Sequence, residues 1–321
     1  MRAVYAETIN PDDPMAGLRL GDLAPATPDN WVTVEVRASS LNHHDLWSLR
    51  GVGLGAEQLP MILGCDAAGV DPDGNEVVVH SVIAGSQSGD ADETMDPKRT
   101  LLSEKYPGTL AERVAVPAGN LVPKPAELSF AEAACLPTAW LTAYRMLRTR
   151  GRLPEGGSVL VQGAGGGVAT AAVVLGTALG ARVYATSRDA GKRERIAALG
   201  ATALEPGARL PERVDVVIET VGEATWGHSM KSLNQGGRIV VAGAHTGAAP
   251  SADLNRLFYR EIAVFGSAMG TLDEFKTLCA FVEHADLHPP LSEVYDGVEK
   301  VRDAMRIMDA GEQFGKLVIR P

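Results

Sequence analysis

The stretch VQGAGGGVATA, residues 161–171, decides the fold because it joins a strand pattern to a helix pattern through a run of glycines. The residues before it, SVLVQ (158–162), form a short apolar run, and GVATAAVVLGTALG (167–180) continues as an apolar helical stretch. A second strand pattern, RVYATS (182–187), ends about 20 residues after the glycines, which is the spacing of a strand–helix–strand unit. A helix N-terminus presents free N–H groups, and glycines let a pyrophosphate approach them. The stretch therefore predicts a dinucleotide-binding loop.

The glycines of this loop have different expected roles. Gly163 is expected to make the turn, whereas Gly165, Gly166 and Gly167 leave the approach to the phosphate open. The position of tight helix–strand packing falls on Ala169, and alanine is an accepted substitute there. The alternative interpretation is a glycine-rich turn that binds no ligand.

The end of the second strand predicts which dinucleotide is bound. An NAD site usually places a carboxylate there for the ribose hydroxyls, but this chain has Ser187 and Arg188, with Lys192 one turn further on. A serine and two cations suit a 2′-phosphate, so the pattern favours NADPH. Two alternatives stay open: Asp189 points at the ribose, or Arg188 and Lys192 only decorate a solvated helix.

Strand and helix patterns alternate beyond this loop. Further apolar runs follow at VDVVIE (214–219), RIVVAG (238–243) and EIAVFGS (261–267). Short apolar strands separated by helices indicate parallel strands covered on both faces. Residues 126–265 are therefore predicted to form a doubly wound α/β domain.

Residues 1–125 have the pattern of strands and loops instead. NWVTVEVRASSL (30–41) alternates apolar and polar residues, and residues 85–108 form a polar segment that we expect to be an exposed excursion. Residues 129–150 have helical spacing, with a capping box at Ser129 and Glu132, and Pro137 is expected to divide them into two short helices. The tail is predicted to contain two helices and a last strand, KLVIR, and to return to the first domain.

Composition limits the class of protein. The chain has 321 residues, more than the ~250–300 at which a single core stops growing, so two domains are expected. The net charge of −10 disfavours a nucleic-acid-binding protein, and no apolar run is long enough to predict a membrane span. The 3 cysteines are far apart and the first residues do not have the pattern of a signal peptide, so a cytoplasmic location is expected.

Taken together, these motifs resemble the medium-chain dehydrogenase/reductase superfamily. The resemblance covers nearly the whole chain and rests on SSLNHHDLWSLRG, LPMILGCDAAGV, GTLAERVAVPAGNLVPKP, AACLPTAWLTAY, the glycine loop, DVVIETVG, GGRIVVAG and GKLVI, in the family's order. It implies a GroES-like, mainly-β catalytic domain (1–125 and 266–321) and a Rossmann NADPH-binding domain (126–265), with the active site in the cleft between them.

The resemblance also suggests which branch of the superfamily the chain joins. Where zinc members have ligands, this chain has Asn42, the pair Cys65 and Asp66, and Thr138, and residues 85–108 contain none of the cysteines of a structural zinc lobe. We therefore predict no bound metal and a position in the zinc-free, quinone oxidoreductase-like branch. An irregular zinc site that uses His43, His44, Cys65 and Asp66 stays open as an alternative.

The predicted activity is hydride transfer from NADPH to a quinone or an α,β-unsaturated carbonyl compound without catalytic zinc. The alternatives are an alcohol dehydrogenase with atypical zinc ligands and a non-catalytic NADPH-binding sensor. The predicted catalytic residues are Asn42, His43 and Asp66. The predicted cofactor-binding residues are Thr138, Gly163, Gly165, Gly166, Gly167, Val168, Ser187, Arg188, Lys192, Thr220, Gly243, Ala244, Gly266, Ser267, Met269 and Lys316. The expected partners are a small-molecule substrate and a second copy of the chain in a homodimer, with no nucleic acid or membrane; EIAVFGS is a candidate edge strand for pairing, although an edge can also be covered within one chain.

Overall fold

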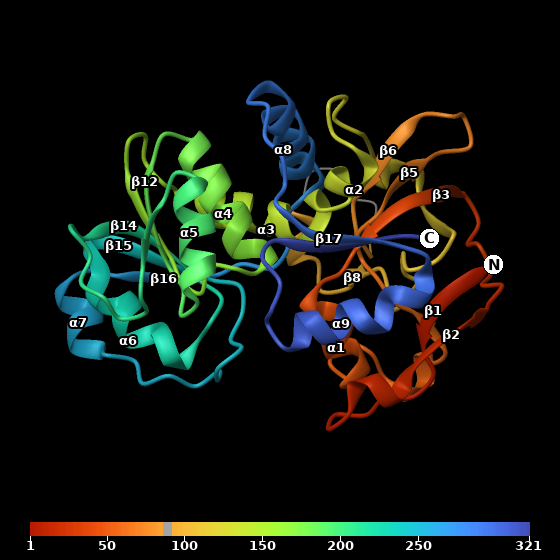
Figure 1. The fold of residues 1–321 in the computed structure, drawn as a ribbon, viewed down its shortest axis with the longest axis horizontal. Coiled ribbons are helices and arrows are strands. Elements are labelled where there is room, and N and C mark those ends of the chain that lie inside the picture. Colours follow the sequence, from red (N-terminus) through yellow and green to blue (C-terminus); the bar gives the residue numbers. More distant parts are fainter. Residues whose placement is uncertain (86–91) are drawn as a thin grey trace. The chain divides into compact units, whose positions relative to one another are not determined.

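A computed structural model describes residues 1–85 and 92–321, and these divide into two compact units (Figure 1). The first unit contains Met1–Ala139 and Gly270–Pro321, and the second contains Trp140–Met269. The expected boundaries lay earlier, at residues 125 and 265. The difference at the first boundary arises because helix α2 (Phe130–Ala133) packs against strands of the first unit.

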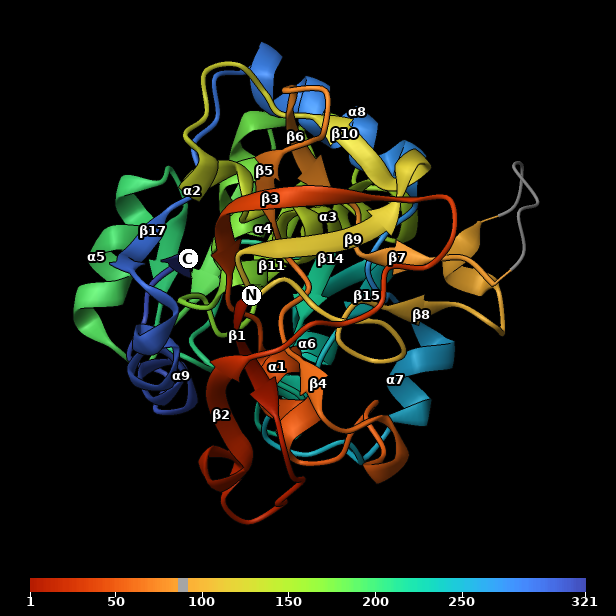
Figure 2. The same cartoon turned by 90° about the vertical axis from the view of Figure 1, so that its right-hand side faces the viewer.

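The first unit is mainly a set of antiparallel strands around β3 (Trp31–Ser40). Along β3 the buried Val34, Val36 and Ala38 alternate with exposed residues, which is the period of a half-buried strand. Figure 2 shows β3 beside β9 (Arg113–Pro117), with which it pairs. The other strands are β1 (Arg2–Ala6), β2 (Leu18–Asp22), β4 (Met61–Ile62), β5 (Ala68–Val70), β6 (Glu76–Val79), β7 (Val82–Ile83), β8 (Thr100–Leu101), β10 (Leu121–Pro123), β17 (Leu291–Asp296) and β18 (Lys316–Arg320).

The tail returns to the first unit, as the sequence predicts. β18 pairs antiparallel with β3 and parallel with β17, a strand that the sequence patterns did not reveal. The two expected tail helices are α8 (Leu272–His284) and α9 (Val301–Asp309). The buried face of α9 packs with α1 (His43–Leu49) in an apolar core. Short 3-10 helices span Pro14–Gly17, Ala56–Gln58, Glu93–Met95, Ala118–Asn120 and Val298–Lys300.

The polar segment 85–108 is only partly the exposed excursion that we expected. Residues 86–91 of it lie outside the described residues. The chain after them turns inward, because Leu102 and Ser103 are fully buried and the carbonyl oxygen of Leu102 accepts a bond from Cys65 Sγ at 3.3 Å. Polar composition alone did not reveal that this segment supplies core residues.

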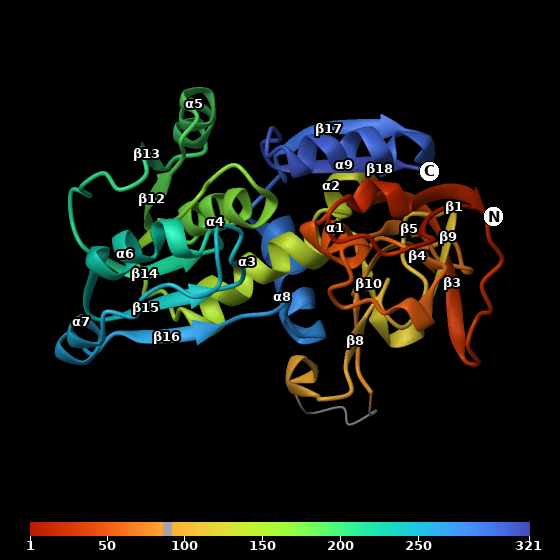
Figure 3. The same ribbon diagram turned by 90° about the horizontal axis from the view of Figure 1, so that it is seen from below.

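The second unit contains the predicted parallel sheet. Its strand order is β13 (Thr202–Leu204), β12 (Arg182–Thr186), β11 (Ser158–Val161), β14 (Val214–Glu219), β15 (Leu233–Val241) and β16 (Ala263–Gly266). All neighbouring pairs are parallel, and Figure 3 shows β14, β15 and β16 as neighbouring arrows with one direction. The order reverses between β11 and β14, which is the switch point where such sheets bind ligands. The GroES-like and Rossmann folds expected from the resemblance are thereby confirmed.

The helices of the second unit are α3 (Leu141–Arg145), α4 (Gly167–Ala178), α5 (Ala190–Ala198), α6 (Glu223–Ser232) and α7 (Leu254–Tyr259), and Met146–Arg150 is π-helical. Of these helices, α4 lies within the predicted helical stretch 167–180, whereas no position was predicted for α6 or α7. Pro137 does separate two short α-helices, α2 and α3, through a π-helical segment at Leu136–Trp140. The predicted capping box is also present, since Ser129 N donates to Glu132 Oε2 at 2.9 Å. Of the described helices, none combines the length and apolar character needed to span a bilayer.

Candidate functional site

A buried polar cluster of the first unit is centred on Asp66. The Asp66 side chain is fully buried, and its Oδ2 accepts hydrogen bonds from Ser40 Oγ at 2.7 Å and from Asn42 Nδ2 at 2.8 Å. Its Oδ1 accepts a hydrogen bond from Thr138 Oγ1 at 2.5 Å. The fold thus brings together Asn42, Asp66 and Thr138, which the sequence marked as altered metal positions. They lie on the loop before α1, the loop before β5 and the π-helical segment, respectively.

Lys316 supplies the positive charge of this cluster. The residue is 3% exposed, and its Nζ donates to Asn42 Oδ1 at 2.6 Å and to the carbonyl oxygen of Leu41 at 2.7 Å. The same nitrogen lies 3.4 Å from Asp66 Oδ2, so the two buried charges form an ion pair. Because β18 begins at Lys316 and lies beside β3, the returning tail places the cation among residues far away in sequence.

Asp45 binds two backbone N–H groups beside the Asp66 cluster. Its carboxylate accepts Asn42 N at 2.8 Å and Gly64 N at 3.0 Å, and therefore ties the loop before α1 to the loop that carries Cys65 and Asp66. Burial raises the pKa of Asp45 to about 6, against the opposing effect of the bond from Asn42. The carboxylate is therefore held at a cost that the two backbone donors only partly offset.

The four residues of the irregular zinc alternative are not arranged as a metal site. Cys65 Sγ points to Leu102 and Ser103, and burial raises the pKa of its thiol well above the ordinary value. His43 and His44 are half-buried at the start of α1, and His44 Nε2 lies 3.9 Å from Glu104 Oε1. Within residues 1–85 and 92–321, no three histidine, cysteine, aspartate or glutamate side chains cluster in a way that could hold a metal ion.

The glycine loop lies at the carboxyl end of β11 in the second unit. Gly163 has a φ of +65°, and an added Cβ there would overlap the side chain of Val221. Gly166 is the N-cap of α4, whose first turn contains Gly167 and Val168 and has no side-chain cap. The free N–H groups of this helix end are therefore directed to the loop surface, as a phosphate site requires.

The residues after β12 include a cation that reaches this loop. Ser187 is buried, Arg188 is exposed, and the side chain of Lys192 lies against Gly165, with Cδ 3.0 Å from an ideal Cβ built there. Asp189 accepts Lys192 N at 2.7 Å as the N-cap of α5. One oxygen of the Asp189 carboxylate, Oδ1, thus has a backbone partner at the start of α5.

The remaining predicted cofactor residues follow the next strands of the same sheet. Thr220 follows β14, and an added Cβ at Gly243 would lie 2.9 Å from its carbonyl oxygen, so the loops after β14 and β15 touch. Ala244 begins a tight turn in which Gly247 N donates to its carbonyl oxygen at 3.2 Å. Gly266 ends β16, Ser267 N donates to Val241 O at 2.9 Å, and Met269 has a φ of +54°. These residues therefore share the carboxyl edge of the sheet.

Sequence reasoning missed several polar residues that hold these sites. Ser40 and Asp45 belong to the Asp66 cluster, and Gln162 and Glu219 lie fully buried beneath the glycine loop. The spacing of Asn42 and Asp45 is that of a capping box, a signal that could have revealed Asp45. The others occupy strand ends, where only the tertiary contacts identify their partners.

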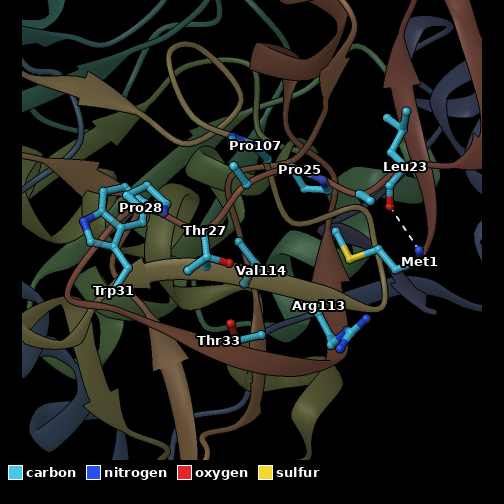
Figure 4. Close-up of a pocket in the computed structure, with 13 residues that line it drawn as sticks. Met1, Leu23, Pro25, Thr27, Pro28, Trp31, Thr33, Pro107, Arg113 and Val114 are labelled. Carbon is cyan, nitrogen blue, oxygen red and sulfur yellow. Dashed lines mark hydrogen bonds between the residues drawn. The ribbon is translucent and has the colours of Figure 1, made fainter.

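A pocket of about 210 Å³ lies elsewhere in the first unit (Figure 4). Figure 4 shows Pro25, Pro28, Trp31 and Pro107 in its wall, with the terminal amine of Met1 bonded to the Leu23 carbonyl oxygen at 3.0 Å. Its lining contains none of the predicted site residues. The pocket therefore adds nothing to the candidate site.

Comparisons with known proteins agree with this architecture. The pattern of the family described as alcohol dehydrogenase GroES-like domain matches residues 28–126, and that of zinc-binding dehydrogenase matches residues 167–284. The chain is 31% identical to 2-methylene-furan-3-one reductase of Solanum lycopersicum, over 92% of this chain and 73% of the relative. It is 30% identical to acryloyl-coenzyme A reductase of Metallosphaera sedula, over 86% of this chain and 90% of the relative.

A solved structure extends the likeness to the whole fold. An NAD-dependent alcohol dehydrogenase superposes with a TM-score of 0.90 at 31% identity, and the match covers 100% of both chains. Both units of this chain therefore match a single solved dehydrogenase structure. From its sequence, its two folds and these relatives, the chain belongs to the medium-chain dehydrogenase/reductase superfamily of oxidoreductases.

Proposed function

We propose that this oxidoreductase transfers a hydride from NADPH to a quinone or an α,β-unsaturated carbonyl compound without catalytic zinc. The observation that carries the proposal is the buried Lys316–Asp66 ion pair, which lies among the residues at the altered metal positions. A fixed ammonium there supplies positive charge at the place where zinc members of the superfamily have their metal.

The residues of the second unit fit NADPH. The open N-terminus of α4 suits the pyrophosphate, and Ser187, Arg188 and Lys192 suit a 2′-phosphate. When bound, this cofactor supplies the hydride for conjugate reduction. Asp189 Oδ1 accepts Lys192 N as the N-cap of α5, so part of its carboxylate is already engaged by the backbone, which favours NADPH over NADH.

The cluster of the first unit does not fit a catalytic zinc ion. Such an ion needs three good ligands, usually thiolates and imidazoles, and one open position. Here the Asn42 amide and the Thr138 hydroxyl both donate to the Asp66 carboxylate, and the Lys316 ammonium already contacts Asn42 and Asp66. A second cation at the same place would be repelled by this ammonium.

The bonds of the cluster suggest a role for each predicted catalytic residue. Asn42 is held at both ends of its amide, by Lys316 at Oδ1 and by Asp66 at Nδ2, so its orientation is fixed. The Thr138 hydroxyl donates its proton to Asp66, and its lone pairs are left to accept a bond from a ligand hydroxyl. The half-buried His43 begins α1 and is our candidate for the proton donor to the reduced substrate.

The names of the relatives support conjugate reduction as the reaction class. The tomato relative is named as a furanone reductase and the Metallosphaera relative as an acryloyl-coenzyme A reductase, and both names describe reductases of conjugated carbonyl compounds. Because the solved structure with the similar fold is named as an alcohol dehydrogenase, the activity test also includes alcohol oxidation.

The activity test is a screen of enones, enoyl thioesters and quinones that follows the loss of NADPH absorbance. We expect turnover that a chelator does not reduce. Oxidation of simple alcohols that a chelator abolishes would instead identify a zinc alcohol dehydrogenase. Tight NADPH binding without turnover of any acceptor would favour a sensor.

The cofactor assignment has its own test. The double variant Ser187→Asp, Arg188→Ala should shift preference from NADPH toward NADH, because a carboxylate repels the 2′-phosphate and accepts the ribose hydroxyls. Arg209→Ala, at an exposed arginine of the same unit, serves as the control and should leave the preference unchanged. An unaltered preference in the double variant refutes the assignment.

We also propose that the partner is a second copy of the chain, paired through the edge of the second unit's sheet. β16 is the edge strand, and Val264 on it is 42% exposed. On the adjoining α7, Phe258 and Tyr259 are 67% and 78% exposed. An uncovered apolar edge of this kind is a template for strand pairing, and a two-fold axis would let two copies bury the same patch.

A further inference from the structure

A continuous chain of hydrogen bonds runs beneath the glycine loop of the second unit. Gly163 N donates to Thr186 Oγ1 at 3.2 Å, and Thr186 Oγ1 donates to Gln162 Oε1 at 2.7 Å. Gln162 Nε2 then donates to Ser229 Oγ at 3.0 Å, and Ser229 Oγ donates to Glu219 Oε2 at 2.6 Å. The four side chains are fully buried, so water does not compete for these bonds.

The carboxylate of Glu219 determines the direction of this chain. Glu219 Oε2 accepts the hydroxyl proton of Ser229, so the Ser229 oxygen is left to accept from Gln162 Nε2. Ser229 Oγ and His228 Nδ1, each 3.0 Å away, both face Gln162 Nε2, so the amide has its oxygen toward Thr186. The Thr186 oxygen is left to accept the N–H of Gly163. Every donor in the chain therefore points away from the loop and toward Glu219.

Glu219 also binds the loop after β14, on the other side of the switch point. Its Oε1 accepts Val221 N at 2.8 Å and Gly222 N at 3.0 Å, and the single hydroxyl proton of Thr225 is shared between the two carboxylate oxygens, each 2.9 Å from Oγ1. The side chain of Val221 lies where a Cβ of Gly163 would be, so the loops after β11 and β14 are in contact. One buried carboxylate therefore anchors both loops.

We propose that Glu219 is a positioning residue for the dinucleotide loop and acts on Gly163 through Ser229, Gln162 and Thr186. The ligand of that loop rests on the proposed function, whereas the coupling between Glu219 and Gly163 does not. With the chain intact, the turn at Gly163 is held in its left-handed conformation before the cofactor binds, and less ordering remains for binding itself.

Two substitutions on α6 give a matched comparison. Ser229→Ala breaks the chain but leaves Glu219 its bonds from Val221, Gly222 and Thr225. Thr225→Val removes a hydroxyl bonded to the same carboxylate but leaves the chain intact. We expect Ser229→Ala to raise the NADPH dissociation constant about tenfold, and Thr225→Val to raise it about twofold or less. Thr186→Val breaks the chain at another bond and should reproduce the effect of Ser229→Ala.

A second measurement is made on the full chain without cofactor. The amide proton of Gly163 should shift in the NMR spectrum of Ser229→Ala but keep its position in Thr225→Val. Equal changes in NADPH binding for Ser229→Ala and Thr225→Val, or a Gly163 amide that does not move in Ser229→Ala, overturns the proposal. If the unsubstituted protein binds no dinucleotide, the proposed function fails, and the Gly163 amide still decides whether Glu219 acts on the loop.

Discussion

At the scale of single residues, the balance of buried charge decides the stability of the Asp66 cluster in the first unit. Asp66 and Lys316 are both almost inaccessible, and each is stabilised by the other and by neutral donors or acceptors. Removal of one partner leaves an uncompensated charge, which is more costly than loss of the pair. The cluster therefore depends on both residues together.

This dependence predicts non-additive losses of stability. Lys316→Met and Asp66→Asn should each lower the free energy of unfolding by about 3 kcal/mol, and the double variant by less than the sum. Urea unfolding of the three variants measures the coupling. The half-exposed pair Arg50–Asp309, at 3.0 Å, serves as a control, since Arg50→Met should cost less than about 1 kcal/mol. Equal losses for the buried and exposed pairs would contradict the prediction.

Asp45 predicts a pH dependence of stability. Its pKa is raised from 3.8 to about 6 by burial, so in this range the folded chain holds a proton that the unfolded chain releases. The contribution of Asp45 to stability therefore declines as pH rises from 3.8 to about 6, and the loss, on the order of 3 kcal/mol, is complete above that range.

Comparison with Asp45→Asn isolates this contribution. Urea unfolding of both proteins across this pH range should show a decline in the unsubstituted protein relative to the variant. Parallel stability curves for the two proteins would mean that Asp45 does not titrate in this way.

At the scale of elements, a comparison of Gly163 with Gly156 distinguishes the conformational role of glycine from its steric role. Gly163 and Gly156 have φ values of +65° and +62°, but only Gly163 lies against another side chain, that of Val221. An alanine at Gly156 therefore meets only the backbone penalty, whereas an alanine at Gly163 also displaces the neighbouring loop.

The two alanine variants should consequently differ in cofactor binding. Each should lose about 1–2 kcal/mol of stability from the left-handed backbone, and Gly163→Ala should also weaken NADPH binding by about tenfold or more. Fluorescence titration with NADPH measures the difference. Comparable affinities in the two variants would show that the turn at Gly163 does not shape the dinucleotide site.

Elements with a strong local pattern were predicted correctly from the sequence. The strands β11, β12 and β14 and the helix α4 follow from apolar runs and the glycine loop, and α2 begins at its capping box. β13 and β17 were missed because they are short or only partly buried, so that their apolar pattern is weak. Their pairing with β12 and β18 supplies what their own sequence lacks.

At the scale of the whole molecule, the exposed edge of the second unit predicts self-association. Val264→Lys places a charge on the edge strand β16, which should convert the proposed dimer to a monomer. Val52→Lys, at a valine of the first unit that is 57% exposed, is the matched control and should leave the dimer intact. Light scattering coupled to size exclusion measures both masses. A monomeric unsubstituted protein, or a dimeric Val264→Lys variant, would refute the interface.

The sequence by itself determined the superfamily, the two folds and the place of the glycine loop between β11 and α4, because glycine conformations, helix caps and strand periods are properties of neighbouring residues. Only the tertiary structure decided the partners of the buried charges. Lys316 reaches Asp66 across 250 positions of sequence, since β18 returns beside β3, and Glu219 reaches Gly163 through side chains from three further positions. Such contacts depend on how distant strands pair, and a local pattern does not contain that information.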